Sequence, residues 1–174
     1  MQTSYNLNPS ASFAGLLGDT GEVDIVTRTG TEKVLYGNIV MKATGDDNVK
    51  LPDAAADATH RLEGILVYSQ DVQSGLSGDG ATPGLDAGTP LNILRKGRIW
   101  VYCETAFNPD SDTLFVRFTD NGAGKTKGQV RNDADSGKAD ELGASGYGIA
   151  FKPLNTLTAA GYLLLDVNFP STVN

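Results

Sequence analysis

Few residues of this chain are of the types that carry out chemistry. His60 and Cys103 are its only histidine and its only cysteine, whereas zinc sites built from these residue types need three or four ligands. His60 stands among polar residues just before a predicted strand, which indicates a surface or loop position, and no local signature supports a dyad with Cys103. Cys103 ends the apolar run 99–103 and is expected to be a buried small hydrophobe. A lone cysteine forms no intrachain disulfide, which suits a reducing compartment.

Three short motifs resemble ligand-binding or catalytic loops but lack residues that those loops require. Residues 122–126 end in Gly-Lys-Thr as a P-loop does, but Thr119 stands where the pattern needs a glycine. Residues 133–137 have the acidic spacing of a calcium loop, but Lys138 replaces its glycine. Ser145 misses the nucleophile-elbow pattern because the following glycine comes one residue early. We therefore expect no enzyme activity, no cofactor and no metal.

The charge balance argues against binding to a phosphate backbone. Lysine and arginine number 14 against 21 acidic residues, a formal net charge of −7. Sequence-independent nucleic-acid binding depends on basic residues that neutralise phosphates, so nucleic acid is not an expected partner. The densest basic cluster, Arg95, Lys96 and Arg98, is predicted to be a solvated face. No stretch approaches the roughly 20 apolar residues of a membrane-spanning helix, and the amino terminus lacks a leader pattern, so we expect no membrane contact and synthesis in the cytoplasm.

The apolar pattern predicts a mainly β fold. Short β-branched or aromatic runs are bounded by Gly, Pro, Asn or Asp, and helical periodicity is hard to find. Residues 43–51 are predicted to form a hairpin, because Gly, Asp and Asn tolerate the positive φ of tight turns. Short strands at this spacing fit a single β-barrel or a jelly-roll-like sandwich. The predicted strands are 24–28, 38–43, 63–69, 91–94, 98–104, 113–118, 148–152 and 161–169.

Three segments fit a compact β domain poorly. Residues 1–21 are predicted to form an extended amino-terminal arm, and residues 22–174 the β-rich domain. Within that domain, 71–88 and 120–146 are predicted to be long loops rich in Gly, Asp and other polar residues. Loops beyond about 12 to 15 residues are uncommon unless they bind something or are disordered.

The order of these features resembles the structural cement, or head decoration, proteins of tailed bacteriophages. The resemblance rests on a pattern of strands and glycines, not on catalytic residues. It runs over most of the chain, with residues 120–146 aligning least well. The segments that carry it are 13–19 (FAGLLGD), 36–42 (YGNIVMK), 49–52 (VKLP), 62–67 (LEGILV), 96–101 (KGRIWV), 112–117 (DTLFVR) and 165–168 (LDVN).

This resemblance implies a β-rich structural protein of the virion. It would bind the outside of the capsid shell, bridge neighbouring major capsid protein subunits and resist the internal pressure of packaged DNA. Such proteins are homo-oligomers at symmetry axes, and a trimer is favoured here over a dimer. A negative surface suits a particle exterior because it favours solubility.

The arm is the predicted capsid-binding element. It could lie along a neighbour or add a strand to a neighbour's sheet edge, or it could fold back as a cap over its own sheet. Its predicted anchors are Tyr5, Leu7, Phe13, Leu16 and Leu17.

Three other functions remain open at this point. One is a tail or baseplate component, and another is a carbohydrate-binding β-sandwich that stacks sugars on Trp100 and tyrosines. Core packing is the preferred interpretation of Trp100, because it lies mid-strand between Ile99 and Val101. The third is a hydrolase with a carboxylate pair, which the concentration of acidic residues in loops disfavours.

Overall fold

The computed structural model describes residues 13–18, 21–53, 62–69, 84–122, 124–142 and 150–169, and the regular elements in these ranges are all β-strands. The predicted mainly β fold is confirmed. No helix in the described part is long and apolar enough to cross a membrane. In chain order the strands are β1 (Asp24–Gly30), β2 (Val34–Leu35), β3 (Ile39–Lys42), β4 (Asn48–Lys50), β5 (Leu62–Leu66), β6 (Gly84–Leu85), β7 (Pro90–Cys103), β8 (Phe115–Arg117), β9 (Val130–Arg131), β10 (Ala139–Glu141), β11 (Ala150–Pro153) and β12 (Gly161–Asn168).

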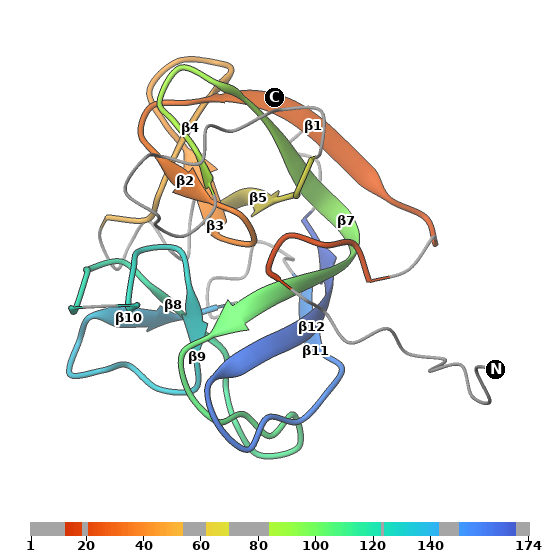
Figure 1. Ribbon diagram of the computed structural model, residues 1–174, viewed down its shortest axis with the longest axis vertical. Helices are drawn as coiled ribbons and strands as arrows, with labels where there is room; N and C mark the ends of the chain where they lie inside the picture. The colour runs from red at the N-terminus through yellow and green to blue at the C-terminus, as the bar shows by residue number, and fades with distance from the viewer. Residues whose placement is uncertain are drawn as a thin grey trace, which may run out of the picture.

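Five strands close into a small barrel, in the upper half of Figure 1. Around the ring, β1 pairs with β4, β4 with β3, β3 with β5, β5 with β7, and β7 again with β1. Closure pairs strand edges that would otherwise remain open. Each of the five strands contributes side chains to one apolar cluster, which includes Val26, Val40, Val49, Leu66, Leu91 and Ile93.

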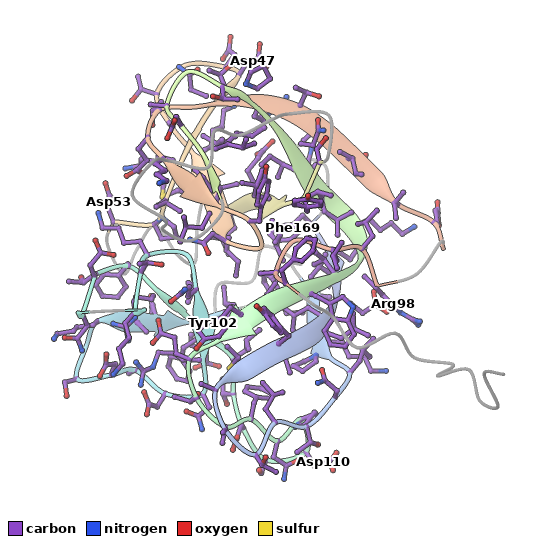
Figure 2. All side chains as sticks on the ribbon, in the orientation of Figure 1. Asp47, Asp53, Arg98, Tyr102, Asp110 and Phe169 are labelled. Carbon is purple, nitrogen blue, oxygen red and sulfur yellow. The ribbon has the colours of Figure 1, made fainter. Side chains whose placement is uncertain are left out.

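A second sheet extends from the barrel in the order β11, β12, β7, β9, β8 and β10. β7 is a strand of both the barrel and the second sheet, so one continuous strand connects the two (Figure 1). A second apolar core lies between the units and takes Ile39, Ile65 and Leu94 from barrel strands and Val101, Leu163 and Leu165 from the second sheet. Phe169 belongs to this core and lies near the centre of the molecule in Figure 2.

The long strand β7 replaces two strands that were predicted separately. Residues 91–94 and 98–104 were expected as two elements, because the polar residues and Gly97 between them separate two apolar runs. Instead the chain continues through Gly97 at φ +128°, and the pairing with β1 skips Arg95 as a bulge does. The skipped residue changes the side-chain alternation, so Leu94 and Ile99 both face the second core although they are five positions apart.

Each of the other predicted strands coincides with an observed one, and the predicted hairpin is confirmed. β3 and β4 pair antiparallel, with Gly45 at φ +99° in the turn between them. Two strands, β9 and β10, lie within the region 120–146 that was expected to be a loop. Strands this short are below the length at which alternation can be recognised. Of the other predicted loop, 71–88, residues 71–83 lie outside the described residues and β6 occupies 84–85.

Candidate functional site

Residues 13–18, here called the docked segment, lie along the middle of β7. The amide of Gly15 donates to the carbonyl of Trp100 (2.7 Å), and the Trp100 amide donates back to Leu16 (2.8 Å). A third bond runs from the Gly18 amide to the Arg98 carbonyl (2.7 Å), and Leu17 is bridged antiparallel to Ile99. The docked segment therefore occupies the edge of β7 that β1 occupies further along, where Asp24 is paired with Lys96.

Two glycines, Gly15 and Gly37, allow the docked segment to pack closely against the residues beside β7. Gly15 has φ +89°, and a Cβ there would lie 2.9 Å from the Tyr68 amide nitrogen. Gly37, at φ +77°, faces it, and a Cβ on Gly37 would lie 2.6 Å from the Cβ of Ala14. Beside this contact the ring of Phe13 meets that of Tyr68 edge-on, with centroids 4.5 Å apart. Small residues and one aromatic anchor thus dock the segment without any ion pair.

The predicted arm residues therefore fall into two groups. Leu16 and Leu17 lie along the chain's own β7 and Phe13 packs on Tyr68, in the cap arrangement that was one of the two alternatives for the arm. Tyr5 and Leu7 lie outside the described residues. Contact of any of these five side chains with a capsid remains a prediction.

An exposed apolar strip, here called the apolar rim, follows the same edge of β7. It consists of Leu17, Val23 and Ile25, which are 38%, 41% and 40% exposed. Their positions are adjacent, because Leu17 is bridged to Ile99, Val23 approaches Gly97, and Ile25 is paired with Leu94. Single exposed apolar residues are normal. Three in a row along one edge make the apolar rim the candidate contact surface.

The apolar rim continues into an open stretch of β1. The Thr29 amide points away from β7 and donates to Asp47 (2.9 Å). In an antiparallel pair alternate residues face the same way, so the main chains of Ile25 and Thr27 also point away from β7. Within the described residues no strand pairs with them there. This edge can accept an added strand from a partner.

A buried ion network, which the sequence did not predict, lies at the far end of β7. Arg117 is fully buried and binds both carboxylate oxygens of Glu104, at 2.6 and 2.7 Å. It also donates to Asp135 (2.6 Å), and Arg131 binds Glu104 (3.2 Å) and Asp135 (2.9 Å). The network joins the end of β7 to β8, to β9 and to the turn before β10. In the sequence each arginine merely follows a valine in a short strand, which is too weak a signal to identify it.

Electrostatics inside this network favour the ionised forms. The Arg117 guanidinium, together with a hydrogen bond from Asn121, lowers the pKa of Asp135 to about 2. Hydrogen bonds to Glu104 raise the pKa of Arg117 above its ordinary value despite its burial. Asp133 accepts from Arg131 (2.8 Å), so both carboxylates of the calcium-like spacing are bonded to arginines.

The remaining sequence-predicted groups form no catalytic cluster among the residues that the structure describes. Cys103 is buried in the second core as expected, and burial raises the pKa of its thiol. His60 and Ser145 lie outside the described residues. Trp100 is half-buried and belongs to neither apolar core. No cluster of three or more potential metal ligands occurs among the described residues.

The predicted solvated basic face is wrong for one of its three residues. Arg95 is only 8% exposed, because it is the residue that the bulge in β7 turns out of register. Lys96 and Arg98 are partly exposed and are bonded to Glu22 (2.7 Å) and to Asp166 (3.5 Å).

A small closed barrel and a second sheet joined through β7 define a mainly β protein. The comparison with known families identifies it further. Residues 1–162 match the family described as structural cement protein (E217 gp24/Pam3 gp6), so the chain belongs to that family. It is a structural cement protein of a bacteriophage, located in the virion capsid, as the resemblance had predicted. A comparison with curated proteins returned no match.

Proposed function

We propose that this cement protein binds the outer face of the capsid and bridges neighbouring major capsid protein subunits. The apolar rim is the observation that carries the proposal. Its three side chains are each about two-fifths exposed and lie beside an open strand edge. Packing them against a partner would remove apolar surface from water, at roughly 25 cal/mol per Å².

Charged groups around the apolar rim have the arrangement expected of an interface. Lys96 and Glu22 form an exposed pair beside Val23, and Arg98 with Asp166 forms another near Leu17. An apolar centre with polar groups at its margin is typical of protein interfaces. In this proposal the partner adds a strand at Ile25 and Thr27, and main-chain hydrogen bonds set its register.

The segment before Phe13 is the second element of the proposed contact. Residues 1–12 carry no charged side chain, and Tyr5 and Leu7 are its largest apolar groups. Fully extended, this segment reaches roughly 40 Å, enough to touch an adjacent subunit. The docked segment would fix the point from which it starts, which lowers the entropy lost on binding.

Repetition on a symmetric shell would strengthen each contact. We propose a homo-oligomer, with a trimer favoured over a dimer, that is made in the host cytoplasm and placed on the capsid exterior. Linked copies bind with an effective concentration that single copies lack, so a modest area per contact is sufficient. The net charge of −7 fits a solvent-facing surface, and neither nucleic acid nor membrane is a proposed partner.

Cosedimentation with capsids that lack the protein tests this proposal. We would compare the full chain with two changed forms. In one, Val23→Thr and Ile25→Thr make the apolar rim polar but keep β-branched residues. The other lacks residues 1–12 and keeps the docked segment. Lys152→Ala, an exposed change on β11, is the control. Sedimentation velocity of the free protein measures its oligomeric state.

The expected result is saturable binding of the full chain and the control, with clear weakening in both other forms. If only the rim variant loses capsid binding, the contact is assigned to the apolar rim and residues 1–12 take no part in it. If the full chain does not bind mature shells, the capsid-surface proposal fails and a tail or baseplate role takes its place.

A further inference from the structure

A pocket of about 240 Å³ lies where the barrel, the second sheet and the docked segment meet. Its walls are largely aromatic, with Tyr102 from β7 and Tyr162 from β12 directly opposite each other in the strand pairing. Their rings are 6.0 Å apart and inclined at 73°. Phe13 and Tyr36 supply further aromatic wall. Figure 2 shows Tyr102 near the carboxyl end of β7.

Two carboxamides give the pocket its polar character, and internal bonds fix the orientation of each. Gln129 accepts the Thr126 amide proton through Oε1 (3.0 Å), and Asn38 donates from Nδ2 to the Lys127 carbonyl (2.7 Å). Gln129 is 7% exposed and Asn38 is 3% exposed. Among the described residues, the Nε2 donor of Gln129 and the Oδ1 acceptor of Asn38 have no partner. Neither atom is among the buried side-chain atoms without a partner, so both are still reached by solvent, and a ligand in the pocket can bond them in place of water.

These features define the chemistry of the ligand. Among the described residues no charged side chain lines the pocket, so a neutral molecule fits this lining best. One donor and one acceptor together suit hydroxyl groups, which both donate and accept. Aromatic walls suit the apolar C–H face of a ring. The volume is below the roughly 300 to 1,000 Å³ of pockets for drug-sized ligands, so it accommodates one ring and not a chain of rings.

We propose that this pocket binds a single neutral sugar ring, a pyranose at the end or in a branch of a glycan. The Tyr102 and Tyr162 rings would contact its C–H face, and Gln129 and Asn38 would bond its hydroxyls. An apolar side chain of a protein partner would fill the walls but leave both carboxamides unpaired, which is costly. The sugar site is separate from the apolar rim, so it adds a function to the proposed capsid contact and does not depend on it.

Weak binding at one such site becomes effective when copies are repeated. The protein is located in the virion capsid, which presents the pocket many times. A glycan surface that carries many sugar ends would engage several copies at once, and avidity would multiply a low single-site affinity.

Saturation-transfer NMR with the full chain tests the site directly. The probes are glucose, galactose, mannose and N-acetylglucosamine, with charged glucuronic acid as the comparison. Gln129→Glu keeps an oxygen that can accept the Thr126 amide, replaces the Nε2 donor with an acceptor oxygen and adds a negative charge. Tyr162→Leu removes an aromatic wall, Tyr162→Phe keeps it, and Lys152→Ala is a control on β11 outside the pocket.

We expect at least one neutral sugar to bind, glucuronic acid to bind less, and Gln129→Glu and Tyr162→Leu each to weaken binding about tenfold or more. Tyr162→Phe should weaken it less, and both Tyr162 variants carry the test if Gln129→Glu does not fold. Capsid cosedimentation of the folded variants should be unchanged, which separates this proposal from the preceding one. Failure of all four neutral sugars to bind would overturn it. Sugar binding that both Gln129→Glu and Tyr162→Leu leave intact would also overturn it.

Discussion

Two peripheral parts of the molecule are attached to β7 by opposite physical means. The docked segment joins the middle of β7 through main-chain hydrogen bonds, glycine contacts and one aromatic ring pair. The lobe formed by β8, β9 and β10 joins its end through the buried carboxylate of Glu104 and two arginines. Main-chain bonds and close packing depend little on pH and salt, whereas buried charges depend on every partner being present and ionised.

This difference indicates which substitutions would detach each part from β7. An ion network tolerates changes in side-chain volume nearby but not the loss of one charge. A glycine contact tolerates changes of charge but not an added methyl group. The docked segment is therefore held by interactions that depend little on pH and salt.

The largest effect should come from Glu104→Gln. This change keeps the shape of the side chain but leaves Arg117 and Arg131 buried with less compensating charge. Breaking a buried pair in this way costs about 3 to 5 kcal/mol. Urea unfolding measures it, with Asp47→Asn as the control, because Asp47 is 81% exposed and its bond to Arg28 is long, at 3.5 Å. Equal midpoints for the two variants would show that the network does not stabilise the lobe.

The next effect concerns the docked segment. Gly15→Ala would place a Cβ 2.9 Å from the Tyr68 amide, and Gly88→Ala is a matched control at a similar φ with nothing within 4 Å. Both variants carry the left-handed penalty of about 1 to 2 kcal/mol, and only the first adds a clash. Hydrogen exchange of the Trp100 amide, which donates to Leu16, is the local measurement. Faster exchange should appear only in Gly15→Ala, and the same acceleration in both variants would contradict the proposed close contact.

Acid should loosen the network and leave the docked segment in place. Because the folded pKa of Asp135 is about 2, against an ordinary 3.8, its contribution to stability is fully present above the ordinary value. That contribution is lost as pH falls through about 2. Thermal unfolding between pH 5 and pH 2 should therefore show a decline that is shallower in Asp135→Asn. Identical pH profiles for the variant and the unchanged protein would exclude Asp135 as a source of acid sensitivity.

The smallest effect should come from the exposed pair beside the apolar rim. Lys96 and Glu22 are 44% and 81% exposed, so water and salt screen their attraction. Lys96→Ala should leave the melting temperature unchanged within error, in low and in high salt. A salt-dependent loss of stability would mean that surface charge supports the edge of β7 after all.

Local pattern predicted much of the fold, because most strands longer than three residues are apolar or alternating runs with their own bounding turn residues. β12 and the hairpin between β3 and β4 were identified in this way. The resemblance to cement proteins likewise rested on strands and glycines in a fixed order, and the family match confirmed it. β9 and β10, of two and three residues, were missed because they are too short to show alternation.

Other features depend on contacts between residues that are distant in sequence. The continuity of β7 through Gly97 follows from its pairing with β1 and β12 on opposite edges. The pairing of Glu104 with Arg117 and Arg131, and of Tyr102 with Tyr162, likewise brings distant positions together. The sequence by itself indicated the mainly β fold, most of the longer strands and the family. The tertiary structure alone decided which edge the docked segment occupies, which charges are buried together and where the aromatic pocket lies. The reason is that local periodicity specifies only which face of a strand is buried, whereas long-range pairing specifies which strands are its neighbours.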